Sequence, residues 1–452
     1  MNSTFRFKNF KIDNFLQLIF ILLPYSLIFS IFFSEVFCLI LTFFYFKENT
    51  VKLSSIIKEN KIIKLLLIFY FILILSTILN IDDPKIILKN LSYVRFIFYA
   101  ISISWILNKF IFLKKLFLYS LLSSFIVLFF GAIYEFVFKR ICITFDENTV
   151  PFFNENILFC SKQFFLGNLI RSDRISSFFG DEMIVGSFVS RLLPLLCLIF
   201  LDSYKSNNQN NLILFLVLFV SLSTVLLSGE RVSLFYTIIF LIILFIFTNF
   251  KFKLIYFFSI IIISFIFISN FPTLKKRFFD QTFDQVLSSY NQEKRIIFFS
   301  IQHESHAISA LKMFYDRPIL GVGPKNFRNA CKKPQYKANK DYPIEFYKGK
   351  KNKDYSCSTH PHNFYIQLLS ETGIFGIIIP LIFLFSIIKF FIRNFYIKII
   401  NKKNNVDMEK IFLYSCFLIT FFPVLPTGNI FNNWMSLIFY IPLGFYLNFR
   451  KT

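Results

Sequence analysis

The sequence predicts an all-α polytopic membrane protein with about twelve transmembrane helices and one large loop on the outer side of the membrane between the ninth and tenth. Of its 452 residues, 56% are apolar and 21% are aromatic, whereas an ordinary soluble domain is about 45–50% apolar. Phe alone supplies 70 residues. The apolar stretches are long, and short segments that carry Lys and Asn separate them. This composition excludes an ordinary soluble globular protein.

Twelve apolar segments are candidate spans, because a spanning helix needs about 20 apolar residues. Only the stretch from Ser30 to Glu35 divides the first two, which are expected to form a tight hairpin. The segments are 14–30, 31–46, 65–80, 91–107, 116–138, 183–201, 211–228, 232–249, 254–270, 372–388, 411–424 and 431–448.

The positive-inside rule orients these segments. With the N-terminus in the cytoplasm, the short inner segments carry 22 Lys and Arg residues and the short outer loops carry 3. Both termini are therefore expected to be cytoplasmic. Much of the net charge of +23 lies in these short inner segments, and no polybasic tail or soluble module remains to read nucleic acid.

The spans divide the chain into five regions. Helices 1–5 occupy 1–138, helices 6–9 occupy 183–270 and helices 10–12 occupy 372–452, with outer loops at 139–182 and 271–371. A connection of about 100 residues is too long to be a simple link and is typical of a functional or independently folded loop. Any chemistry is therefore expected at the outer face.

All four histidines lie in the second outer loop, as His303, His306, His360 and His362. Solvated loop histidines are the alternative interpretation. However, the run Thr359-His360-Pro361-His362-Asn363 leads directly into the tenth helix, with Glu371 further along. A histidine at a helix entry near the membrane surface can accept a proton from a hydroxyl group at neutral pH.

A second motif in this loop is the run from Pro318 to Phe327, which contains Gly321 and Gly323. Glycine at these positions implies a tight backbone turn or a close approach to a ligand. A single Gly-x-Gly that follows no Rossmann strand and precedes no P-loop lysine does not indicate nucleotide binding.

Arginine is concentrated in the same half of the chain. Only 13 of the 49 basic residues are Arg, and 9 of these 13 lie between Arg140 and Arg328. Guanidinium groups bind phosphate oxygens in a bidentate manner, so this set favours an anionic, phosphate-bearing ligand at the outer surface. For each single Arg, a helix cap, an ion pair or a lipid headgroup contact is the alternative. The candidates include Arg171, Arg174, Arg231 and Arg295.

Four of the seven cysteines lie in the two outer loops, as Cys142, Cys160, Cys331 and Cys357. They fit an oxidising compartment, most simply as one disulfide within each loop, although four thiols allow three pairings. The chain has neither a CxxC nor an HExxH motif, so no zinc site is predicted.

Together these motifs resemble the O-antigen ligase and polymerase family of bacterial envelope glycosyltransferases. The resemblance is carried by PILGVGPKNF and, about 30 residues later, CSTHPHNFYIQLLSETGIFG. The upstream RSDRISSFFGDEMIVGSFVSRLLPLL and the SGERVSLF at 228–235 look like the other two landmarks of that family.

The resemblance implies a metal-independent, inverting glycan transfer at the outer face of the bacterial inner membrane, with no cofactor. The donor would be an undecaprenyl-diphosphate-linked glycan. It implies that His362 is the general base, with His360 as the alternative, and that Arg174, Arg231 and Arg295, with Arg171 nearby, contact the diphosphate. Asn363, Glu371, Gly321 and Gly323 would support the site.

Three functions remain open at this stage. A ligase would use a lipid A core sugar as acceptor, and a polymerase would use another lipid-linked glycan. The third is a transporter or flippase of lipid-linked glycans. Transport is disfavoured because intramembrane charge is sparse, no inverted repeat is visible, and the polar residues gather on one face.

Overall fold

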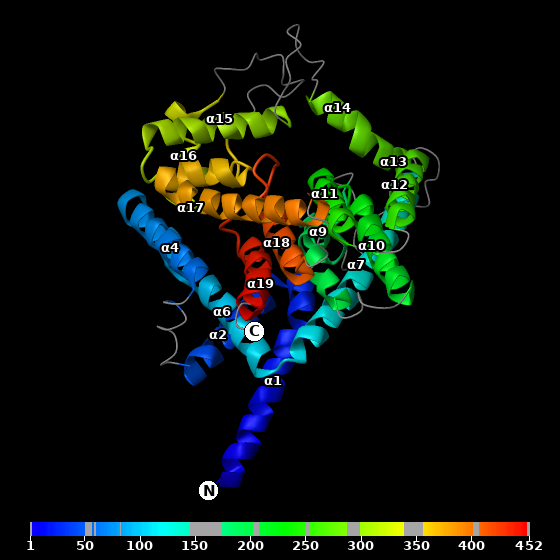
Figure 1. Ribbon diagram of the computed structural model, residues 1–452. Helices are drawn as coiled ribbons and strands as arrows, with labels where there is room; N and C mark the ends of the chain where they lie inside the picture. The colour runs from blue at the N-terminus through cyan, green and yellow to red at the C-terminus, as the bar shows by residue number, and fades with distance from the viewer. Residues whose placement is uncertain are drawn as a thin grey trace, which may run out of the picture.

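The chain folds into a helical bundle in the computed structural model (Figure 1). The structure describes residues 2–49, 57, 60–81, 83–144, 174–201, 208–248, 253–286, 299–338, 356–400 and 406–449. Every regular element within these ranges is a helix, as the apolar pattern predicted.

Helices occur at all twelve predicted segments. The main ones are α1 (Asn2–Phe29), α2 (Ile31–Asn49), α4 (Lys61–Asn80), α5 (Pro84–Leu91), α6 (Arg95–Lys109), α7 (Leu113–Thr144), α9 (Val185–Leu196), α10 (Asn208–Ser228), α11 (Arg231–Phe247), α12 (Lys253–Asn270), α17 (Phe364–Phe395), α18 (Met408–Thr420) and α19 (Asn433–Phe449). Shorter helices of the second outer loop are α13 (Pro272–Lys275), α14 (Gln281–Val286), α15 (Ile301–Asp316) and α16 (Phe327–Ala330).

Five of the described helical stretches are long and apolar enough to cross a membrane, or six if the bent pair that α12 begins counts as one span. Shorter apolar helices include α10 and α11. Large apolar side chains on the outer surfaces of several helices are exposed, among them Phe32, Phe71 and Phe385. Such a surface is suited to lipid rather than to water. The structure therefore supports a multi-pass membrane protein, while the number of spans stays a prediction.

The core is packed by rings from helices that are distant in sequence. Phe117 of α7 lies between Phe20 of α1 and Phe445 of α19, with ring centroids 5.0 and 5.2 Å away. Gly444 of α19 faces Ile103 of α6, where a Cβ would clash, so this glycine lets the two helices approach closely. The abundant Phe thus fills the interior as well as covering the lipid-facing surface.

Two helix ends differ from the prediction. α7 continues to Thr144, six residues past the predicted span at 116–138. α17 begins at Phe364 rather than at 372, because the side chain of Asn363 caps it by accepting from the backbone N–H groups of Tyr365 and Ile366. Gly373, at φ 64° and ψ −162°, then breaks α17 into a short first part and a long second part.

The second outer loop begins with a sharp turn. The helix axis bends by 103° between α12 and the stretch that starts at Pro272. Pro272 stands at the first helical position, where its missing N–H costs nothing. In Figure 1, α15 and α16 lie over α17 at one end of the bundle, and α13 and α14 lie above α10 and α12 at the same end.

Candidate active site

The side chains of all four histidines lie together in one cluster. The ring centroid of His362 lies 4.1 Å from that of His360, 5.2 Å from His306 and 5.3 Å from His303. His303 and His306 come from α15, whereas His360 and His362 precede α17. We call these four residues the histidine cluster. Sequence analysis singled out only the second pair as catalytic candidates.

His362 stands in a constrained backbone conformation. Its φ is 57°, in the left-handed region that residues other than glycine rarely adopt. The backbone N–H of Thr427 donates to the His362 carbonyl over 2.8 Å, which holds this conformation. Strain of this kind is frequent at functional sites, where the surrounding structure maintains it.

The segment between α18 and α19 anchors the same motif. His360 Nε2 lies 3.2 Å from the Thr427 carbonyl oxygen, and Asn363 Nδ2 donates to the carbonyls of Pro423 and Leu425. Asn363 therefore caps α17 and also attaches its start to the C-terminal helices. Sequence reasoning missed Thr427, because no motif marks it.

Burial makes the histidine cluster hard to protonate. His306 and His360 are 7% and 8% exposed, and burial is the largest cause that lowers the pKa of each to about 4. Burial, followed by the charges of the other three rings, lowers the pKa of His362 to about 2. The Nδ1 atom of His306 is buried without a hydrogen-bond partner among the described residues. The rings are therefore neutral at pH 7 in the ligand-free site.

The run from Pro318 to Phe327, which we call the glycine motif, packs against the break in α17. Backbone N–H groups of Val322 and Gly323 donate to the carbonyls of Ser370 and Glu371, over 2.9 and 3.0 Å. A Cβ on Gly321 would meet the backbone of residues 370–372. The motif thus serves a close approach of backbone to backbone, which only glycine allows.

Glu371 supports this contact from inside the protein. Its carboxylate accepts from the backbone N–H of Phe327 over 2.9 Å and from Gln367 Nε2 over 3.0 Å. Gln367 also donates to Asn429 in the segment before α19. Glu371 therefore holds the glycine motif on α17 rather than facing the histidine cluster.

Two of the predicted arginines lie together at the start of α11. Arg174 is 3.6 Å from the Glu230 carboxylate, and it also donates to the Met183 carbonyl. Arg231 donates to Thr282 Oγ1 over 2.9 Å and to Gln285 Oε1 over 2.8 Å, both in α14. Glu230 accepts from the Gly186 backbone N–H and the Ser233 hydroxyl. The described contacts of Arg231 are to neutral groups, so they leave its charge uncompensated.

Arg231 also faces the histidine cluster. After burial, its positive charge is the second cause that lowers the pKa of His303. His303 therefore contacts His362 and also lies within electrostatic reach of Arg231. Of the residues that sequence analysis proposed for the chemistry, the structure brings His360, His362, Arg174 and Arg231 to one end of the bundle.

Comparison with known families agrees with this arrangement. Residues 216–381 match the O-antigen ligase family, and the match includes Arg231, the whole histidine cluster and the glycine motif. We call residues 216–381 the O-antigen ligase segment after this match. The chain matches no curated protein.

The O-antigen ligase segment also contains a disulfide. Cys331 and Cys357 are bonded, with their Cα atoms 5.2 Å apart. The bond joins the stretch that follows the glycine motif to the stretch that precedes His360. It therefore ties together two of the motifs that bear the site.

Some proposed residues fall outside the described part of the chain. These are Arg171, Arg295 and Cys160, together with the side chain of Cys142, whose backbone lies in the last turn of α7. Within the described part, no group of three or more His, Cys, Asp and Glu side chains could hold a metal ion.

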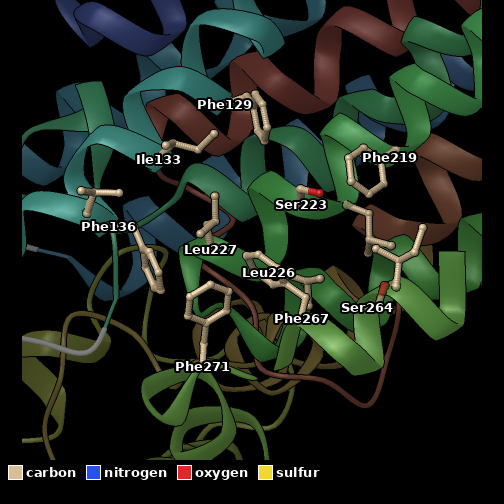
Figure 2. Close-up of a pocket in the computed structure, with 13 residues that line it drawn as sticks. Phe129, Ile133, Phe136, Phe219, Ser223, Leu226, Leu227, Ser264, Phe267 and Phe271 are labelled. Atoms are coloured by element: carbon tan, nitrogen blue, oxygen red, sulfur yellow. The ribbon is translucent and has the colours of Figure 1, made fainter. Parts of the chain in front are cut away.

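An apolar cavity of about 550 Å³ lies beside the arginines of the O-antigen ligase segment (Figure 2). Its walls come from α7, α10 and α12, with Phe129, Leu226 and Phe267 among the residues that point into it. Leu227, which also lines it, is four residues before Arg231. Arg277 donates to the carbonyl of Gly229, which is two residues after Leu227, over 3.2 Å.

Proposed function

We propose that the protein is an O-antigen ligase, which transfers a glycan from undecaprenyl diphosphate to a lipid A core hydroxyl at the periplasmic face. The observation that carries this proposal is that the ring of His303 contacts that of His362 and also lies within electrostatic reach of Arg231. A neutral base and a guanidinium group whose described contacts are all to neutral groups therefore lie near each other. Transfer from a diphosphate needs these two functions.

In the proposed step, the acceptor hydroxyl attacks the anomeric carbon of the donor sugar. His362 accepts the hydroxyl proton, the new C–O bond forms, and the bond from the anomeric carbon to the diphosphate oxygen breaks with inversion. Arg231 and Arg174 neutralise the charge that develops on the departing diphosphate. Preorganised cations in a water-poor site stabilise such charge strongly.

The donor has two parts, and the site offers a surface for each. The diphosphate suits Arg174 and Arg231, and a polyprenyl chain suits the apolar cavity between α7, α10 and α12. A bound diphosphate beside His303 would also raise the pKa of the histidine cluster toward neutrality, because a nearby negative charge favours the protonated ring. The donor would in this way tune the base that acts on it.

The twelve-span topology is part of the same proposal, with both termini cytoplasmic and both long loops periplasmic. Fusions of a reporter that is active only in the periplasm test it. We expect activity after residues 182 and 338 and none at either terminus. Activity at a terminus would contradict the orientation.

Reconstitution tests the reaction. Purified protein in phosphatidylcholine nanodiscs should move the glycan of a lipid-linked donor onto a lipid A core, and deletion should leave lipid A without long glycan while lipid-linked polymer accumulates. Transfer only to a second lipid-linked repeat would instead identify a polymerase. No transfer to either acceptor would contradict both.

A further inference from the structure

A second group of cations lies on the other side of the bundle. Lys325 belongs to the glycine motif, Lys89 to α5 and Arg95 to the start of α6. Asn90 Nδ2 donates to the Pro324 carbonyl over 3.1 Å, which docks the motif on α5. A Cβ on Gly323 would meet Ile81, so the motif also packs closely on the end of α4.

The acidic groups near these cations are already engaged. Arg95 and Glu35 form a bidentate ion pair with contacts of 3.0 and 3.2 Å. Both carboxylate oxygens of Glu371 accept hydrogen bonds, from Phe327 and Gln367. No carboxylate in the described part of the chain forms an ion pair with Lys325.

Lys325 has a strained backbone and a partly buried side chain. Its φ is 63°, again in the left-handed region, and the residue is half-buried. Burial, then the charges of Arg95 and Lys89, lowers its pKa to about 8, and the opposing effects of Glu371 and Glu35 are smaller. The group is therefore a preorganised, mostly charged ammonium that no partner neutralises.

This cation group and the arginines at α11 lie on opposite sides of the histidine cluster. In Figure 1, α4 and α6 flank α17 and α19 on one side, while α9 to α12 lie on the other. The first part of α17 connects Asn363, next to His362, with Glu371, next to Lys325. Eight residues of helix separate them, which is about 12 Å at 1.5 Å per residue.

We propose that Lys325, assisted by Lys89 and the field of Arg95, binds a phosphate group of the lipid-anchored acceptor. The inference rests on the proposed function, in which the donor diphosphate occupies Arg174 and Arg231. Two lipid-anchored substrates then approach the base from opposite sides, each held by its own anion site. The first sugars of the acceptor span the distance from Lys325 to His362.

Pyrophosphate binding tests the second site without any turnover. Isothermal titration of the full-length protein in phosphatidylcholine nanodiscs should find two sites. Arg231→Ala should remove one, and Lys325→Gln should weaken the other about tenfold, as expected for the loss of one charge-assisted contact. Lys325→Arg should retain both. Lys332→Gln is the control, because Lys332 is an exposed lysine of the same loop.

An isotherm for Lys325→Gln that superimposes on that of the wild type would overturn the proposal. The pH dependence is a second readout. Binding at the Lys325 site should be complete below pH 7 and should fall above pH 8, as the ammonium loses its proton. Lys325→Arg should abolish that fall, because a guanidinium stays charged.

Kinetics assign the site to the acceptor. With saturating donor, Lys325→Gln should raise the KM for a phosphate-bearing acceptor about tenfold and leave the donor KM unchanged. A rise in the donor KM instead would overturn the assignment. The assignment would also be overturned if added phosphatidylglycerol, but not the acceptor, displaced pyrophosphate from this site. That result would identify a site for a phospholipid headgroup. If both pyrophosphate sites exist but no acceptor is glycosylated, the proposed function fails while the anion site stands.

Discussion

Gly321 and Gly373 occupy reciprocal positions where the glycine motif meets α17. A Cβ on Gly321 would strike the backbone of residues 370–372, and a Cβ on Gly373 would strike the backbone of Ile319 and Leu320. Both residues also have positive φ, 67° and 64°. Each glycine therefore makes room for the chain that carries the other.

Gly321→Ala or Gly373→Ala should destabilise the outer loop. The left-handed conformation costs about 1–2 kcal/mol for a residue with a Cβ, and the backbone overlap adds about 1–3 kcal/mol. Gly180→Ala is the matched control, since Gly180 has φ 64° but no atom within 4 Å of the added Cβ. Thermal unfolding in detergent should show a much larger drop for the first two variants. Equal drops in all three would mean that the overlap is relieved at little cost.

This contact shows what could be predicted from sequence and what could not. Long apolar runs predicted where the helices lie, because a spanning helix needs its own length of apolar residues. The helix entry after Asn363 was expected, but the predicted span began only at 372, because Gln367, Ser370 and Glu371 are polar. In the structure these three side chains are buried.

The site was predictable to the same degree. Glycine-, histidine- and arginine-bearing motifs are local, so His360, His362 and Arg231 could be named from the sequence. Their contacts with His303 and with Thr282 join residues far apart in the chain, and a single sequence carries no signal for such contacts. The position of all four histidines in one loop was the only hint.

His362→Ala should lower glycan transfer by about 10²–10⁴-fold, the usual contribution of a general base. Quantitative transfer from a purified lipid-linked donor measures it, with EDTA present to remove free metal ions. His360→Ala is the comparison, because the two rings are 4.1 Å apart. If only the His360 variant is inactive, the base is His360. Full rates in both variants would rule out a histidine base.

The acid limb of the pH profile should move when donor binds. In the free enzyme the lowered pKa values of His360 and His362 keep both rings neutral above about pH 5. The acid limb of kcat/KM, which reports the free enzyme, should therefore lie below that of kcat, which reports the complex. Coincident limbs would indicate that bound donor does not affect the base.

Acid should also destabilise the loop. His306 and His360 have folded-state pKa values of about 4, below the unfolded value of about 6.5. Their contribution to stability is thus present above pH 6.5 and is lost as pH falls toward 4, because the unfolded chain binds protons first. The unfolding temperature should fall across this interval, and His306→Asn should flatten the decline. An unchanged slope in that variant would show that His306 does not titrate there.

Arg231→Ala should abolish transfer, and Arg231→Lys should recover little. A lysine supplies a point charge but not the bidentate fork, so the loss should be about 2–4 kcal/mol of transition-state stabilisation. Lys276→Ala, at an exposed position of the neighbouring helical segment, should be neutral. Near-normal activity of the lysine variant would mean that Arg231 contributes charge alone.

Cys331 and Cys357 should be recovered as one disulfide-linked peptide by mass spectrometry of protein purified without reductant. The bond closes a loop of sequence separation 26, which corresponds to about 3–4 kcal/mol in the chain-entropy model. Cys331→Ala should accordingly lower the unfolding temperature. Free thiols at both positions would contradict the bond.

Under the proposed function, the apolar cavity between α7, α10 and α12 also determines which donor concentration controls the reaction rate. Val137 and Ile263, which line it, are 46% and 39% exposed on helices of the proposed spans, so in the proposed topology the cavity opens toward the bilayer. A donor that enters by this route is taken from the plane of the membrane. Its effective concentration is a mole fraction of lipid, and added phospholipid slows the reaction by surface dilution even when the amounts of enzyme, donor and water are unchanged.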